Sequence, residues 1–156
     1  MIFLKTFQKF ESTQAKRESS CCIIVNNKDE VLVLQRGPTA PWMPLKWNLP
    51  GGQSENGESH DQTAEREVYE ETDLKLSSIK FFKKIYDEKD NYFLNVFIGK
   101  IDSQNPNIIL DKHPTIESGK KIIECVDYKW VNSDTFEILE YVPYTKEILI
   151  EYFSKL

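Results

Sequence analysis

The stretch that decides the fold is residues 50–74, PGGQSENGESHDQTAEREVYEETDL. Residues 60–72 contain no glycine or proline, so nothing in this part interrupts a helix. Ser59 and Gln62 have the spacing of a capping box, in which two side chains satisfy free N–H groups of the first helical turn. The sequence therefore predicts a helix over residues 60–72, preceded by a polar loop and a tight turn.

Three glutamates lie on one face of this predicted helix. At 100° per residue, Glu67, Glu70 and Glu71 fall within an arc of about 100°, close to the apolar stripe of Ala64 and Val68. Like charges at these spacings destabilise an isolated helix by roughly 0.2–0.5 kcal/mol per pair. A hard cation such as Mg²⁺ would neutralise them, because it prefers oxygen ligands. A solvated acidic face is the alternative that the helix alone leaves open.

The turn in front of the helix favours a ligand site. Pro50, Gly51 and Gly52 carry little side-chain bulk, so their backbone groups can approach a ligand closely. The turn, the loop and the acidic helix form one continuous unit.

This unit resembles the Nudix box, G-x5-E-x7-R-E-U-x-E-E-x-G-U, where U is a bulky aliphatic residue. The matching positions are Gly52, Glu58, Arg66, Glu67, Val68, Glu70, Glu71 and Leu74. One specified position differs, because Asp73 stands where the pattern has glycine. That glycine ends the helix in a left-handed conformation that aspartate tolerates, so we expect a modest stability cost and intact chemistry.

Segments outside the box are similar to Nudix proteins as well, namely residues 34–36, 47–52 and 129–131. The resemblance implies an α/β fold of the Nudix type. This is an α/β/α sandwich, in which helices flank a mixed central sheet and the box forms a loop-helix-loop.

The resemblance also implies an activity, a cofactor and a site. Nudix enzymes hydrolyse a nucleoside diphosphate linked to another group, with Mg²⁺ as cofactor and Mn²⁺ as a substitute. The family pattern assigns metal binding to Glu67, Glu70, Glu71 and the carbonyl of Gly51. It assigns Glu58 and Arg66 to bracing the loop against the helix, so that Arg66 orients a glutamate.

The general base that activates water differs among family members. Glu67 is one candidate within the box, and Glu124, six residues before Trp130, is the preferred acid outside it. Asp127 and Glu117 are further candidates. An exposed strand residue is the alternative interpretation of Glu124.

Substrate contacts are predicted from residue type. Arg36 suits phosphate oxygens because of its planar fork, although it could equally be an ordinary residue at a strand end. Several aromatic residues could stack on a base, although such residues are more often part of a core. The predicted substrate-binding residues are Arg36, Trp47, Gly52, Tyr92, Phe93 and Tyr144.

The residues after the box separate the substrate classes of the family only weakly. Residues 89–91 lack the proline of some ADP-ribose hydrolases, and Tyr92 lies where some dinucleoside-polyphosphate hydrolases have a tyrosine. We expect a dinucleoside polyphosphate or a (deoxy)nucleoside triphosphate. An ADP-ribose or nucleotide-sugar hydrolase is the alternative. A non-catalytic nucleotide-binding module is another, but such modules usually lose box glutamates.

The remaining chain predicts strands on both sides of the helix. We expect an edge strand at residues 1–10, a hairpin at residues 21–34, long strands at residues 76–86 and 92–101, and a strand at residues 121–131. Residues 37–46 and 102–119 are predicted loops, and Pro143 is the predicted first residue of a closing helix.

Length and charge limit the classes of partner. The chain of 156 residues predicts a single domain over residues 1–156. Its net charge of -5 argues against long nucleic acid as a partner, whereas the three box glutamates mark where a small polyphosphate and its metal would bind. No apolar run reaches the ~20 residues of a membrane span, and the three cysteines fit reduced thiols in the cytoplasm. A monomer and a homodimer both remain open.

Overall fold

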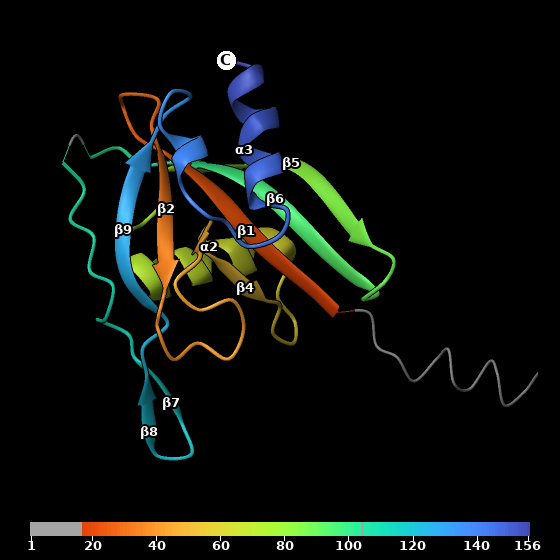
Figure 1. Cartoon of the computed structure of the whole chain (residues 1–156), viewed down its shortest axis with the longest axis vertical. Coiled ribbons are helices and arrows are strands. Elements are labelled where there is room, and N and C mark those ends of the chain that lie inside the picture. The colour runs from red at the N-terminus through yellow and green to blue at the C-terminus, as the bar shows by residue number, and fades with distance from the viewer. Residues whose placement is uncertain (1–16, 104) are drawn as a thin grey trace, which may run out of the picture.

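The computed structural model describes residues 17–103 and 105–156, and its centre is one mixed β-sheet (Figure 1). The expected edge strand at residues 1–10 lies outside the described residues. The strands are β1 (Arg17–Val25), β2 (Val31–Arg36), β3 (Trp47–Asn48), β4 (Gly51–Gln53), β5 (Ser78–Asp87), β6 (Tyr92–Lys100), β7 (Thr115–Glu117), β8 (Lys120–Ile122) and β9 (Cys125–Val131).

The strand order of the main sheet is β3-β2-β1-β6-β5, with β4 paired to β1 and β9 paired to β2. β1 and β6 run parallel over their whole length, and the other pairs are antiparallel. The sheet is therefore mixed, as predicted. β7 and β8 form a separate two-stranded hairpin at one end of the molecule (Figure 1).

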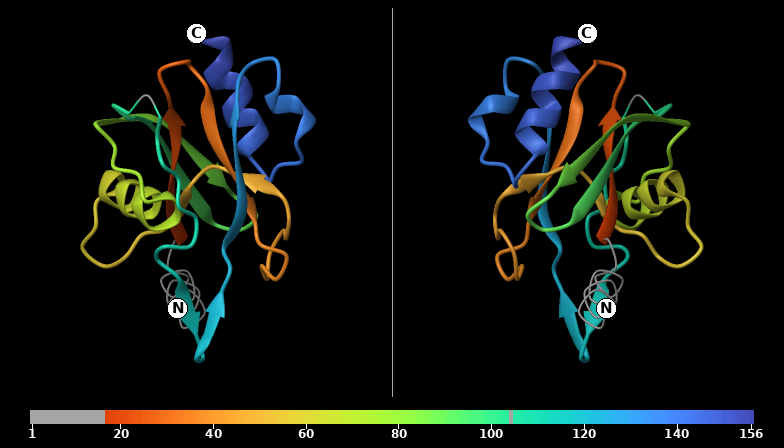
Figure 2. Two further views of the ribbon diagram at one scale, coloured as in Figure 1. Left: turned by 90° about the vertical axis from the view of Figure 1, so that its left-hand side faces the viewer. Right: turned by 90° about the vertical axis from the view of Figure 1, so that its right-hand side faces the viewer.

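Two helices cover opposite faces of the sheet, which gives the predicted α/β/α sandwich (Figure 2). They are α2 (His60–Thr72) and α3 (Thr145–Ser154), and a short 3-10 helix, η1 (Phe136–Ile138), precedes α3. Side chains alternate along β1 because successive residues of a strand point to opposite faces. Cys22 and Ile24 pack in the core under α2, whereas Cys21 and Ile23 pack in the core under α3. Among the described residues, no helix has the length and apolar character needed to cross a membrane.

Several boundaries differ from the predictions for physical reasons. The predicted strand at residues 121–131 is two strands, since the chain leaves the hairpin at Ile122 and joins the main sheet at Cys125. Residues 102–119, predicted as a loop, contain β7. The closing helix begins at Thr145 and not at Pro143, because Tyr144 between them is left-handed, with φ 73°.

Candidate active site

The helix α2 forms as predicted and carries the box glutamates. At its start, the backbone N–H of Ser59 donates to Gln62 Oε1 over 3.0 Å, which is one half of the capping box. At its end, Asp73 is left-handed, with φ 61° and ψ 16°, and its N–H donates to the carbonyl of Tyr69. Aspartate therefore occupies the conformation in which the family pattern has glycine.

Glu71 is the most buried of the three glutamates, with 7% of its surface exposed. The N–H of Gly51 donates to its Oε1 over 3.2 Å, and the thiol of Cys125 donates to its Oε2 over 3.7 Å. Burial, followed by the nearby charge of Glu67, raises the pKa of Glu71 well above the usual value. Its negative charge is thus costly unless a cation compensates for it.

Glu67 lies directly against the Gly-Gly turn. A Cβ at Gly52 would come within 2.4 Å of Glu67 Oε1, so any larger residue would displace the carboxylate. Burial is the main cause that raises the pKa of Glu67, and the charge of Glu70 adds to it, whereas Arg66 acts in the opposite direction. The close approach explains why this box position has glycine.

Arg66 links the loop to the helix. Its Nε donates to Glu58 Oε1 over 2.6 Å, and its Nη2 donates to the carbonyl of Gln53 over 3.0 Å. Its Nη1 donates to Glu67 Oε1 over 2.8 Å and to Glu70 Oε2 over 3.1 Å. The hydrogen bond from Arg66 is the main reason why the pKa of Glu58 is lowered to about 2. The expected ion pair between Glu58 and Arg66 is therefore present, and it braces the loop against the helix.

Of the candidate bases outside the box, Glu124 has the clearest connection to the glutamates. It lies just before β9, and its charge raises the pKa of both Glu67 and Glu71. Its Oε1 accepts a hydrogen bond from Thr115 Oγ1 over 2.6 Å. Glu117 instead pairs in register with Lys120 in the β7-β8 hairpin.

The last of these candidates, Asp127, is exposed on β9, and its Oδ1 accepts the N–H of Tyr128. The geometry thus favours Glu124 among these acids, and its role as the base stays a prediction.

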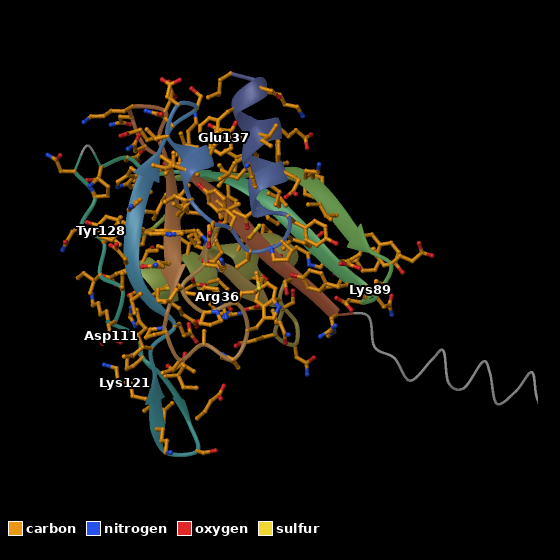
Figure 3. All side chains as sticks on the ribbon, in the orientation of Figure 1. Arg36, Lys89, Asp111, Lys121, Tyr128 and Glu137 are labelled. Carbon is orange, nitrogen blue, oxygen red and sulfur yellow. The ribbon has the colours of Figure 1, made fainter. Side chains whose placement is uncertain are left out.

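Arg36 lies at the end of β2, on the side of the molecule that carries the loop of residues 37–46 (Figure 3). Its Nε donates to the carbonyl of Trp42 over 2.8 Å, and its guanidinium lies 5.3 Å from the centre of the Trp42 ring. Arg36 pairs in register with Cys125, and its charge acts on the Cys125 thiol. Cys125 therefore lies between Arg36 and Glu71, since its thiol contacts Glu71. A phosphate contact by Arg36 stays a prediction.

The structure corrects the prediction that Trp47 stacks on a base. Only 7% of Trp47 is exposed, because its ring belongs to the core under α3, and Lys129 Nζ lies 5.2 Å from the ring centre. A large aromatic side chain at a strand position is here part of the core.

The other predicted aromatics lie around the β5-β6 turn. Phe93 stacks on Tyr86 with ring centres 4.5 Å apart, and the hydroxyl of Tyr144 donates to Asp87 Oδ2. Tyr92 is half-buried, and burial raises its pKa. A base contact by these residues stays a prediction.

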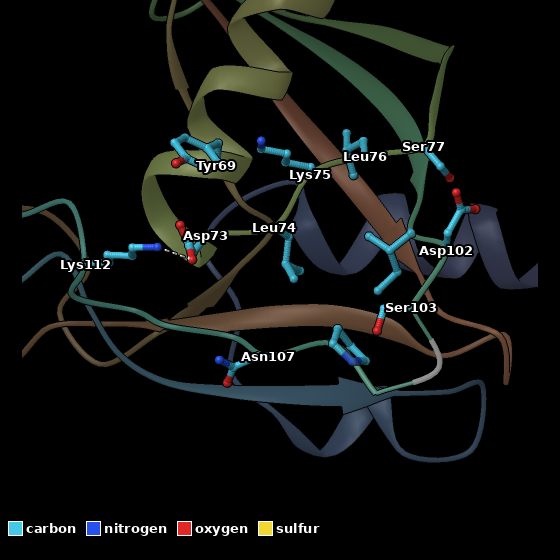
Figure 4. Close-up of a pocket in the computed structure, with 12 residues that line it drawn as sticks. Tyr69, Asp73, Leu74, Lys75, Leu76, Ser77, Asp102, Ser103, Asn107 and Lys112 are labelled. Carbon is cyan, nitrogen blue, oxygen red and sulfur yellow. Dashed lines mark hydrogen bonds and ion pairs between the residues drawn. The ribbon is translucent and has the colours of Figure 1, made fainter.

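A cavity of about 640 Å³ lies beyond the carboxyl end of α2 (Figure 4). Tyr69, Asp73 and Lys112 are among the residues that line it, and Lys112 Nζ pairs with Asp73 Oδ2 over 2.8 Å. His113 also contacts Asp73, and its ring lies 4.8 Å from that of Tyr69. None of the box glutamates lines this cavity, so it is separate from the predicted metal site.

The donor set of the box fits a hard divalent cation. Glu67 and Glu71 are crowded, partly or fully buried, and have raised pKa values, and carboxylate oxygens are the ligands that Mg²⁺ prefers. Within residues 17–103 and 105–156, no three acidic, histidine or cysteine side chains are already gathered in metal-site geometry. Arg66 pairs with Glu67 and Glu70.

Two residues at this site were missed by sequence reasoning. Cys125 is 54 positions from Glu71 in the sequence, and only the pairing of β9 with β2 brings its thiol to the helix. Trp42 lies in a proline-rich loop, and only its exposure and its contact with Arg36 distinguish it from the other tryptophans. The proximity of Trp42 to Arg36 in the sequence was the one available signal.

Comparisons with known proteins bear on the family and the fold of the chain. The family model described as NUDIX domain matches residues 15–152. The MutT protein of Methanosarcina mazei Go1 has a similar structure, with TM-score 0.67 and 23% identity over 89% of this chain and 93% of that chain. No curated protein sequence matches the chain.

Two further similar structures are a complex with ADP ribose and an Ap4A hydrolase. The NUDIX domain of Shewanella oneidensis NrtR, complexed with ADP ribose, has TM-score 0.68 and 17% identity over 93% of this chain and 91% of that chain. An Ap4A hydrolase of C. elegans, in a binary complex, has TM-score 0.62 and 20% identity over 88% and 96% of the two chains.

The fold and the box, which departs from the family pattern only at Asp73, define an α/β/α sandwich protein with an acidic helix at its candidate site. The chain belongs to the NUDIX domain family, and it is an enzyme of the Nudix hydrolase class.

Proposed function

We propose that the chain hydrolyses a phosphoanhydride bond in a nucleoside diphosphate linked to another group, with Mg²⁺ or Mn²⁺ as cofactor. The observation that carries this proposal is the burial of Glu71 beside Glu67, with the pKa of both carboxyls raised. Burying a carboxylate costs free energy unless a partner compensates for its charge, and a bound cation would supply that compensation. Glu67, Glu70, Glu71 and the Gly51 carbonyl would hold the metal.

Each residue of the candidate site would have its own role in the proposed reaction. Magnesium, when bound, would neutralise polyphosphate charge and lower the pKa of a bound water. Gly51 and Cys125 orient the two oxygens of Glu71, and Arg66 orients Glu67. Glu124 would accept the proton of the attacking water as general base, with Glu67 as the alternative, because a carboxylate near the glutamates can do so over hydrogen-bond distance.

For the substrate, we favour a dinucleoside polyphosphate or a (deoxy)nucleoside triphosphate. The similar structures include a MutT protein, an Ap4A hydrolase and a complex with ADP ribose. They support a nucleotide as the substrate but do not distinguish among the classes of nucleotide. ADP-ribose or nucleotide-sugar hydrolysis is the second candidate. Against a non-catalytic binding module stands the complete set of box glutamates.

We also infer a cytoplasmic enzyme with a small-molecule partner, built as a single domain. All three cysteines are free and buried, as expected in a reducing compartment.

The test is a hydrolysis assay with purified protein, Mg²⁺ and a panel of nucleoside diphosphate derivatives. The panel holds a dinucleoside polyphosphate, nucleoside triphosphates, ADP-ribose and a nucleotide sugar. We expect release of phosphate, pyrophosphate or a nucleotide from at least one member. Glu70→Gln and Glu71→Gln should abolish this release and leave the circular dichroism spectrum unchanged.

Glu65→Gln is the matched control, since Glu65 is an exposed glutamate of the same helix outside the proposed ligand set. It should retain wild-type activity. Equal activity in all three variants would contradict the proposed metal site, and an inactive wild-type protein on the whole panel would contradict the proposed reaction.

A further inference from the structure

The loop between β2 and β3, residues 37–46, exposes a tryptophan beside the predicted site. Trp42 has 52% of its surface exposed, whereas Trp47 is buried at 7% and Trp130 is half-buried. Trp42 thus has the most accessible ring of the three tryptophans, and an accessible aromatic ring can contact a ligand.

The loop is held to β2 by hydrogen bonds at several points. The N–H of Arg36 donates to the carbonyl of Lys46 over 2.9 Å, and the N–H of Leu45 donates to the carbonyl of Arg36 over 3.2 Å. The side chain of Gln35 donates to the carbonyl of Leu45 over 3.1 Å. The Arg36 side chain fixes the loop tip, because its Nε donates to the carbonyl of Trp42. The exposed ring is thus presented by an ordered loop.

The guanidinium of Arg36 also braces the ring itself. It lies 5.3 Å from the ring centre, which is within the range of a cation–π contact. One side of the indole is therefore backed by a positive charge, while half of the side chain stays in contact with solvent. A rigid aromatic plane beside a cation suits a ligand that joins an aromatic ring to phosphates.

A chain of contacts connects this ring to the box. Arg36 pairs in register with Cys125, and the Cys125 thiol contacts Glu71 Oε2 over 3.7 Å. Next to Arg36, the N–H of Gly37 donates to the carbonyl of Glu124 over 2.8 Å. Trp42 is therefore linked through Arg36 to the segment that carries Glu124 and Cys125, and Cys125 contacts Glu71.

We propose that Trp42 stacks on the nucleobase of the substrate, and that Arg36 supports the Trp42 ring from a position between the base and the phosphates. The proposal rests on the proposed function, because it takes the phosphates to lie at the box glutamates. It makes Trp42 a specificity-determining residue for nucleotides over ligands that have no base.

The test compares ligands with and without a base. Isothermal titration calorimetry in the presence of Mg²⁺, with short runs, would compare the affinities for ADP, GDP, CDP and UDP with the affinity for inorganic pyrophosphate. We expect Trp42→Ala to weaken binding of at least one nucleoside diphosphate by about 5- to 150-fold, the range found for one base–aromatic stack. Its pyrophosphate affinity should stay within about twofold of wild type. Nucleoside diphosphates, but not pyrophosphate, should also quench the fluorescence of the wild-type protein.

Two variants control for damage to the loop. Trp42→Phe keeps an aromatic plane and should retain most of the nucleotide affinity. Leu45→Ala changes a residue of the same loop that is 51% exposed, and it should bind all ligands like wild type. Unchanged nucleotide affinity in Trp42→Ala, an equal loss for pyrophosphate, or no binding of the four nucleotides by wild type would each overturn the proposal.

The same protein separates this proposal from the proposed function. A wild type that hydrolyses a nucleotide while Trp42→Ala keeps its KM would overturn the stacking role alone. A wild type that binds nucleotides through Trp42 and hydrolyses none of the panel would overturn the reaction alone.

Discussion

Replacing Glu71 with glutamine should stabilise the metal-free protein at neutral pH while it abolishes hydrolysis. Glu71 is 7% exposed, and burial together with the charge of Glu67 raises its pKa well above the ordinary value of 4.5. Glutamine has nearly the same shape and carries no charge, and its amide oxygen can still accept the N–H of Gly51. The variant therefore removes the cost of a buried charge without opening a cavity.

The sign and size of the effect follow from proton linkage. The folded protein holds the Glu71 proton more tightly than the unfolded chain does, so the free energy of unfolding falls as pH rises above about 4.5. One such group lowers it by about 1.4 kcal/mol per pH unit until the folded pKa is passed. At this chain length, 1 kcal/mol corresponds to roughly 2–4 °C in Tm. Wild type should therefore lose roughly 3–6 °C per pH unit relative to the variant in that window.

Thermal unfolding in EDTA from pH 4 to pH 8, followed by circular dichroism, measures this difference. Because Glu67 and Glu71 interact, the midpoint of the change belongs to the pair. Mg²⁺ at 100 times its Kd should then raise wild-type stability by about 2.7 kcal/mol, or roughly 5–11 °C, and should raise the variant much less. A Tm difference that stays constant from pH 4.5 to 8, or a variant less stable than wild type at pH 7, would refute the reasoning.

Three further predictions use other contacts of the box. Arg66→Lys should weaken Mg²⁺ activation by about 10- to 100-fold, because a point charge cannot hold both Glu58 and the glutamates, and an unchanged Mg²⁺ titration would contradict this. Asp73→Gly should change the free energy of unfolding by less than about 1 kcal/mol, since glycine relieves the left-handed conformation while the ion pair with Lys112 is lost. Because that pair holds Lys112, limited proteolysis of the variant should cut residues 105–114 faster than in wild type. The thiols should resist a thiol reagent in the native protein at pH 8, because burial raises the pKa of all three, and should all react in denaturant; fast native labelling would be inconsistent with their burial.

The sequence was most informative where local rules act. The helix bounds, the capping pair at its start and the left-handed Asp73 at its end depend on residues within a few positions of one another, and each was confirmed. The ion pair between Glu58 and Arg66 spans a single loop and helix, so the box spacing was enough to indicate it.

Predictions that depend on strand pairing were less successful. Cys125 reaches Glu71 only because β9 lies beside β2, and no local pattern marks a lone cysteine. Trp47 looked available for a base, but its strand places it in the core. The predicted start of the last helix was wrong because Tyr144 adopts a positive φ, a conformation that is uncommon for a tyrosine and that the sequence does not indicate.

The arrangement of donors on Arg66 explains how one residue can serve both the loop and the proposed metal site. Its Nε and Nη2 hold Glu58 and the carbonyl of Gln53, whereas its Nη1 holds Glu67 and Glu70. A divalent cation at the proposed site would approach Arg66 only at the two glutamates, because the other two partners lie outside the proposed ligand set. Nη1 of Arg66 would then share Glu67 and Glu70 with the cation, while Nε and Nη2 keep the guanidinium anchored. Since these donors form a rigid plane, the loop would keep its position when a bound metal compensated the charge of the glutamates.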